Sequence, residues 1–265
     1  MFTITASSQA QSDNYIFYYD EPFAVFSKEA GFSKFSLRSK DPKTEKYKLN
    51  KALAKTIKFL WQYKENETPV KFSVEKFEFD PENDDCEQEA KVVLKGIEPN
   101  GFFTSKPLKR RVGSTLHEAT GKENKNAARL VGEYLRSDGY KASAIAAILA
   151  SINVSAVNLG PNERDSLIVQ ANLDLHKKSI SMLAIITPGE DKQLEISFAE
   201  IYSSAIEAET EAVHIDFRDN IDMGDGKGDR ILLELSHWEN VDFILLSRPN
   251  NRKVWKKEIS FNRGC

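Results

Sequence analysis

The sequence predicts an α+β protein of mainly antiparallel sheets in two lobes, with a short helical region between the lobes. Short apolar runs separated by turn residues fill the C-terminal half, and this pattern is typical of an antiparallel meander. Two further pairs of such runs precede residue 98. An alanine-rich stretch of helical character lies between the two groups.

The N-terminal lobe begins with a predicted β-hairpin. Residues 14–27 are rich in Tyr, Phe and Val on both sides of the turn sequence Asp20-Glu21-Pro22. Residues 71–80 and 89–98 predict a second pair of strands, which an acidic loop at residues 81–85 connects.

A helix is expected between these two strand pairs. Leu53, Ile57 and Leu60 recur at helical spacing, which predicts an amphipathic helix over residues 50–63. The preceding residues 34–48 are lysine-rich and contain a proline, so they are expected to form a solvated connector.

The central helical region consists of residues 127–136 and 141–151 on either side of Ser137-Asp138-Gly139. A helix-turn-helix motif requires a second helix with a polar face for the DNA groove. Residues 144–150 are instead apolar nearly all round. We therefore expect a core helix that is buried on nearly all sides.

These patterns divide the chain into an N-terminal α+β lobe at residues 1–105, a basic linker or loop at 106–126, and a C-terminal lobe at 127–265. The C-terminal lobe starts with the two helices and continues as an antiparallel sheet. Its strands are expected at residues 166–174, 179–187, 193–198, 212–217, 230–235, 241–246 and 254–261, with a helix at 199–208 among them.

Composition excludes several classes of protein. A formal net charge of −3 and a pI near 5.9 exclude a generally basic, histone-like binder but permit a local basic patch. Cys86 and Cys265 make no disulfide framework. The chain shows no secretory signal and no apolar run of membrane-spanning length, so we expect a soluble cytoplasmic protein with no membrane partner.

The most concrete candidate site is a basic segment in and after the predicted linker. Clustered Lys and Arg side chains can neutralise phosphates and release counterions, although such runs are more often plain solvated surface. No aromatic residue follows closely enough to suggest a platform for stacking bases. The candidate nucleic-acid-binding residues are Lys106, Lys109, Arg110, Arg111, Lys122, Lys125 and Arg129.

A second candidate is Glu89-Ala90-Lys91 on a predicted strand, preceded by Asp80, Asp84 and Asp85. This arrangement is similar to that of metal-dependent nucleases of the PD-(D/E)xK type, in which two acids bind the ion and the Lys activates water. The aspartates lie closer in sequence than that nuclease core places them. An exposed, charged strand face explains the triplet more simply, so no catalytic residue is assigned.

Residues 219–229 combine Asp219, Asp222, Asp225 and Asp229 with three glycines. Carboxylates on a glycine-rich loop could hold Ca²⁺ or Mg²⁺, but the spacing does not match an EF-hand, and a long polar turn is the more economical interpretation. No metal site is therefore predicted.

Enzyme signatures are absent from the sequence. His117, His176, His214 and His237 lie far apart, without a zinc-site spacing. His176 with Asp174, and His214 with Asp216, share a strand face at period two, which is an ordinary arrangement for surface strands. The sequence has no phosphate-binding loop, no dinucleotide fingerprint and no G-x-S-x-G, so no cofactor is expected.

The sequence therefore favours a binding or accessory protein with nucleic acid as its most concrete partner. The alternatives are the metal-dependent nuclease and a structural protein that assembles with itself or another protein through sheet edges.

Overall fold

The computed structural model describes residues 13–19, 21–27, 30–34, 53–63, 69–78, 91–108, 115–160, 165–175, 178–189, 191, 193–205, 214–226, 228–237, 240–248 and 254–264. The chain forms two compact units, Met1–Arg110 with Gly264–Cys265, and Arg111–Arg263. Antiparallel sheets dominate both units and the helices are few, which confirms the predicted α+β class.

The first unit contains a seven-stranded sheet with the order β3-β2-β1-β7-β4-β5-β6. The predicted hairpin is confirmed, because the first two strands pair with Tyr18 opposite Glu21. The second predicted pair is also present, as the fifth and sixth strands of the unit. The strands are β1 (Asn14–Tyr18), β2 (Glu21–Ser27), β3 (Gly31–Lys34), β4 (Phe59–Tyr63), β5 (Pro69–Glu78), β6 (Lys91–Leu94) and β7 (Phe102–Thr104).

The expected helix over residues 50–63 is wrong in its second half. Residues 53–56 are helical, but β4 begins at Phe59 and pairs with β5 and β7. Leu53, Ile57 and Leu60 nevertheless all enter the core of this unit. The apolar pattern was therefore correct about burial, and sheet pairing of the aromatic-rich end overrode its helical period.

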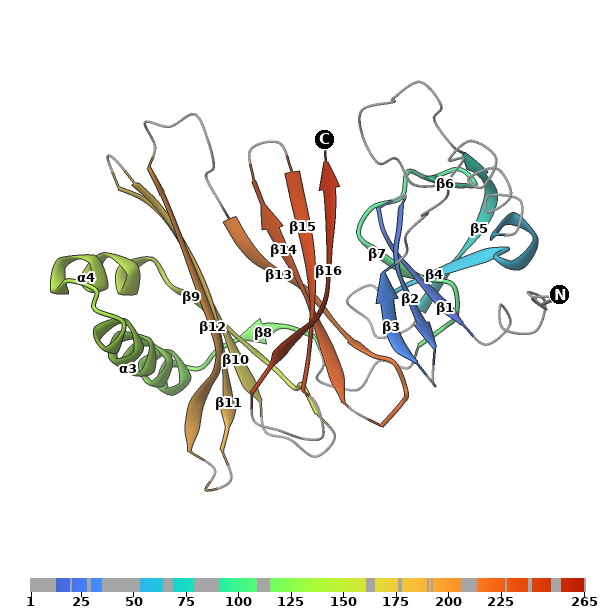
Figure 1. Ribbon diagram of the computed structural model, residues 1–265. Helices are drawn as coiled ribbons and strands as arrows, with labels where there is room; N and C mark the ends of the chain where they lie inside the picture. The colour runs from blue at the N-terminus through green and yellow to red at the C-terminus, as the bar shows by residue number, and fades with distance from the viewer. Residues whose placement is uncertain are drawn as a thin grey trace, which may run out of the picture. The chain divides into compact units, whose positions relative to one another are not determined.

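The second unit is built in three layers. Figure 1 shows α3 and α4 against one side of a five-stranded sheet with the order β12-β11-β10-β9-β8, and a four-stranded sheet, β13-β14-β15-β16, on its other side. The elements are β8 (His117–Glu118), α3 (Gly121–Ser137), α4 (Ala142–Ser151), β9 (Asn153–Val157), β10 (Ser166–Leu175), β11 (Lys178–Pro188), β12 (Leu194–Ala205), β13 (His214–Asp222), β14 (Asp229–Ser236), β15 (Asn240–Ser247) and β16 (Lys256–Gly264).

Strand β11 is buried from Ser179 to Thr187 because both faces of its sheet are covered. Side chains at alternating positions divide between two cores: Met182 and Ala184 face the helices, whereas Leu183 and Ile185 face the second sheet. A polar bond also joins the sheets, since the Ile215 N–H of β13 donates to Ser181 Oγ at 2.9 Å. A strand that is covered on both faces, as β11 is, requires a nearly continuous run of apolar residues.

The predicted helix at residues 199–208 is wrong over residues 199–205, and residues 206–208 lie outside the described ranges. Strand β12 continues through Ala205 and pairs with β11 along its whole length, with a bulge opposite Ile185 and Ile186. Pairing with β11 satisfies the backbone groups on one side of this edge strand, and Ile and Tyr favour strands. Strand β9, which pairs with β10, and the short strand β8 were not predicted from the sequence.

The two helices cover the sheet with a core of small and branched side chains. Ile145 and Ile148 of α4 are buried, but Ala146 and Ala150 are exposed, so the helix is not buried on nearly all sides as expected. Gly132 of α3 is buried beneath α4, and a Cβ at this position would lie 3.3 Å from Leu149 Cδ1.

Among the described residues, no helix has both the length and the apolarity needed to cross a membrane.

Replacing Ile148 with alanine should destabilise the protein by about 2–5 kcal/mol, because a fully buried side chain is lost and a cavity remains between α4 and the sheet. Ala146→Ser on the exposed face of the same helix should change stability by less than about 1 kcal/mol. Denaturant unfolding of both variants measures the difference. Equal stability losses would show that α4 does not pack as described.

Candidate functional site

Helix α3 has a fixed start. Thr120 Oγ1 accepts the Glu123 N–H at 3.3 Å, and a Glu123 carboxylate oxygen accepts the Thr120 N–H at 2.7 Å, which completes a capping box. The bond from the Thr120 backbone is the main cause that holds the pKa of Glu123 below its usual value. The cap sets which residues of the first turn face solvent.

The exposed face of α3 carries a row of cations. Lys122, Lys125 and Arg129 are exposed, and Arg136 continues the row in the last turn. At about 100° per residue, these four positions fall within about 60° of the helix and span about 21 Å along it. The buried residues on the opposite side are Ala127, Val131 and Leu135. We call Lys122, Lys125, Arg129 and Arg136 the α3 basic face.

One acidic side chain interrupts the α3 basic face. Arg129 Nη1 bonds both carboxylate oxygens of Glu133 at 2.9 and 3.0 Å, one turn along the helix. Because both partners are about half exposed, such a pair contributes only about 0.3–0.5 kcal/mol. Within the described part of the chain, Lys122, Lys125 and Arg136 make no ion pair. The face therefore keeps most of its positive charge.

The structure brings together part of the predicted basic segment. Lys122, Lys125 and Arg129 share one helix face in the second unit, whereas Lys106 lies in the first unit. The Lys106 N–H donates to Asn14 Oδ1 at 3.0 Å. Partial burial lowers the pKa of the Lys106 ammonium, and Asp13 opposes this shift. Lys109, Arg110 and Arg111 lie outside the described residues.

Arg136 was missed in the sequence-based selection of binding residues. It lies seven residues after Arg129, so its helical spacing from the predicted cations was a usable signal.

Most residues of the nuclease hypothesis lie outside the described ranges. This holds for Asp80, Asp84, Asp85 and Glu89, so their relation to Lys91 is untested. Lys91 opens β6 opposite Glu78 of β5. This cross-strand register is the ordinary arrangement of opposite charges on a sheet surface.

The glycine-rich segment around residues 219–229 is a hairpin loop whose carboxylates already have partners. Asp222 Oδ1 accepts the Gly224 N–H at 2.8 Å, and Asp229 Oδ2 accepts from the Asn220 side-chain amide at 2.8 Å. Gly224 and Gly226 have φ values of 67° and 77°, which favour glycine. The described residues contain no group of three His, Cys, Asp or Glu side chains that could hold a metal ion.

Asp219 accepts the Asn220 N–H at 2.8 Å, and Asp225 pairs with Arg230 of β14. The Arg230 side chain is 1% exposed and binds both oxygens of Asp225, at 2.6 and 2.7 Å. The Gly228 carbonyl accepts a further bond at 3.1 Å. Burial alone would lower the pKa of the Arg230 guanidinium, but bonding and charge from Asp225 raise it overall. Asp225 and the Gly228 carbonyl of this loop therefore hold the buried Arg230 side chain.

Two of the described histidines, His117 and His237, form partly exposed pairs with acids. His117 Nε2 lies 3.4 Å from Asp165 Oδ2, and His237 Nε2 lies 3.3 Å from Asp242 Oδ2. On β13, Asp216 accepts a bond from the Gln170 amide at 3.0 Å. His176 lies outside the described residues. These arrangements include no oriented nucleophile, so none is assigned a catalytic role.

Asp225→Asn should destabilise the protein by about 3 kcal/mol, because the buried Arg230 loses its bidentate partner and keeps the longer contact of its Nε with Glu258 Oε2, at 3.7 Å. Glu133→Gln removes the same kind of pair from an exposed position and should cost less than about 0.5 kcal/mol. Denaturant unfolding at neutral pH compares the two. A small loss in Asp225→Asn would show that the loop is not organised by this pair.

No family model matches the chain, and neither a curated protein nor a solved structure shows significant similarity to it.

Proposed function

We propose that the protein binds nucleic acid through the α3 basic face, which contacts phosphates and does not read bases. The observation that carries this proposal is the alignment of Lys122, Lys125, Arg129 and Arg136 on one exposed face of a capped helix. A formal net charge of −3 makes such a local concentration of positive charge the natural contact for a polyanion.

The dimensions of the face suit a phosphate backbone. Its length of about 21 Å corresponds to about six base-pair steps along the axis of B-form DNA. Long Lys and Arg side chains give affinity by releasing counterions, and such contacts position a protein without specifying sequence. Both features support a role as an accessory protein that binds many sequences with similar affinity.

The double variant Lys122→Ala/Lys125→Ala should weaken binding to oligonucleotides of unrelated sequence by a similar factor. Each lost phosphate contact should also reduce the slope of log K against log salt by about 0.9, so the pair should reduce it by up to about 1.8. Fluorescence anisotropy at several salt concentrations measures both quantities.

A matched control is Lys55→Ala/Lys256→Ala, which removes the same charge from exposed positions outside α3. We expect its salt slope to equal that of the wild type. If the two double variants lose slope equally, net charge governs binding and the α3 basic face has no special role. Wild-type protein without salt-dependent binding would remove the proposal.

We also propose that residues 109–111 contact phosphates, in addition to the contacts of the α3 basic face. Replacing Lys109, Arg110 and Arg111 with alanine should flatten the salt slope by up to about three contacts, again without regard to sequence. The same anisotropy titrations measure this effect. An unchanged slope in the triple variant would show that the segment is solvated surface, whatever the α3 result.

A further inference from the structure

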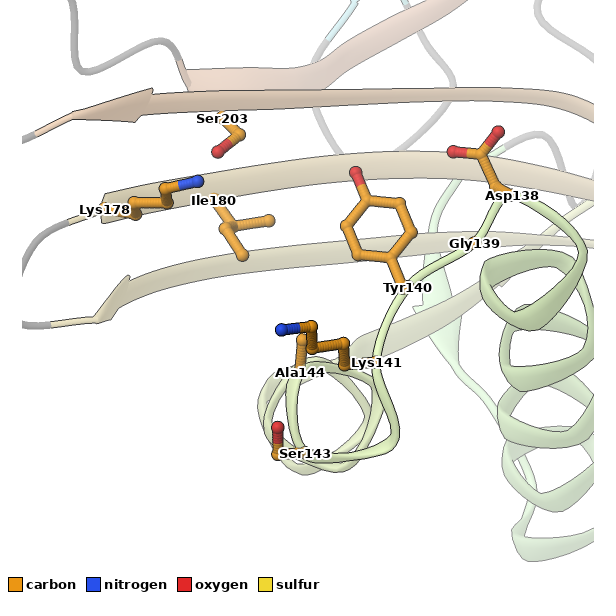
Figure 2. Close-up of a pocket in the computed structure, with 9 residues that line it drawn as sticks. All are labelled: Asp138, Gly139, Tyr140, Lys141, Ser143, Ala144, Lys178, Ile180 and Ser203. Carbon is orange, nitrogen blue, oxygen red and sulfur yellow. The ribbon is translucent and has the colours of Figure 1, made fainter.

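A cavity of about 470 Å³, widely open to solvent, lies where the turn between α3 and α4 meets the start of β11 and the end of β12. Figure 2 shows its polar lining, which comes from Asp138, Tyr140, Lys141, Ser143, Lys178 and Ser203. The buried side chain of Ile180 forms an apolar part of the wall. Cavities of this volume suit small organic ligands.

Two ammonium groups from distant parts of the sequence face this cavity. Lys141 precedes α4, and Lys178 begins β11. Within the described residues, neither ammonium forms an ion pair, and the side-chain hydroxyls of Tyr140 and Ser203 have no hydrogen-bond partner. Two unneutralised cations and two free hydroxyls therefore line one small space.

The lining is divided by charge. In the view of Figure 2, the ammonium groups of Lys141 and Lys178 lie on one side of the Tyr140 ring, and the Asp138 carboxylate lies on the other. Burial, followed by the negative charge of Asp138, raises the pKa of the Tyr140 phenol. The phenol thus stays protonated at neutral pH and can donate a hydrogen bond.

We propose that this cavity binds a phosphate monoester, with the phosphate between Lys141 and Lys178 and the organic part beside Tyr140 and Asp138. A monoester carries close to two negative charges at neutral pH, which matches two ammonium groups better than a singly charged diester does. The Asp138 carboxylate then accepts a hydrogen bond from a ligand hydroxyl, as a sugar would supply.

The same chemistry occurs in free sugar phosphates and at the phosphorylated end of a nucleic-acid strand. The cavity does not use the α3 basic face, so the proposal holds with or without the function proposed above. The two sources differ in the group that is esterified to the phosphate, a single sugar or a whole strand, and a titration can separate them.

The test titrates the full chain with ribose 5-phosphate, with ribose, and with an oligonucleotide carrying either a 5′-phosphate or a 5′-hydroxyl. Isothermal calorimetry and the chemical shifts of amides at residues 138–144 report binding. We expect saturable binding of ribose 5-phosphate and none of ribose. If the 5′-phosphate also tightens oligonucleotide binding, strand ends are a source of the ligand; if it does not, the ligand is the free monoester.

Variants separate this site from general attraction to anions. Lys141→Gln/Lys178→Gln should weaken ribose 5-phosphate binding about tenfold or more, because both charge-assisted bonds are lost. Lys141→Arg/Lys178→Arg should retain most of the affinity, since the charges remain. Lys122→Ala/Lys125→Ala should leave ribose 5-phosphate binding unchanged, even where it weakens oligonucleotide binding.

The proposal is overturned if the wild type shows no saturable binding of ribose 5-phosphate, or if the Lys122 and Lys125 variant loses as much affinity as the Lys141 and Lys178 variant. Circular dichroism spectra confirm that each variant is folded, so that a loss of binding reports on the site.

Discussion

The second unit depends on one constraint: both faces of the sheet around β11 must be covered. Met182 on one side and Leu183 on the other enter different cores, so this strand needs the helices and the second sheet together. Burial of apolar side chains on both faces contributes about 25 cal/mol for each Å² removed from water. The helical layer is thus part of the core structure, and its outward face is left available for other roles.

The sequence predicted burial better than it predicted secondary structure. Leu53, Ile57 and Leu60 are core residues as expected, yet Leu60 lies in a strand. Residues 199–205 of the supposed helix at 199–208 belong to β12, because pairing with β11 decides their conformation. Periodicity reports which side chains are apolar, but the choice between helix and strand for such segments depends on a partner that is distant in sequence.

The candidate sites also differ in how far apart in the sequence their residues lie. Lys122, Lys125 and Arg129 share a helix face, but Lys122 and Lys125 were predicted to lie in a linker; the helix was expected to begin at residue 127, whereas α3 begins at Gly121 behind its capping box. The cavity could not be predicted, because Lys141 and Lys178 approach only after α4 docks on the sheet. The aspartates of the loop before β14 suggested a metal ion, whereas the buried Arg230, which the sequence pattern did not identify as their partner, accounts for Asp225.

The close approach of α4 to Gly132 bears on how the cavity can change through mutation. Leu149 meets this glycine near the end of α4, about 12 Å from Lys141 at its start. A larger residue at 132 would push the helix along or away from the sheet and so change the width of the cavity at its other end. Under the proposed ligand binding, substitution of Gly132, which does not line the cavity, therefore changes selectivity while every residue of the cavity wall stays the same.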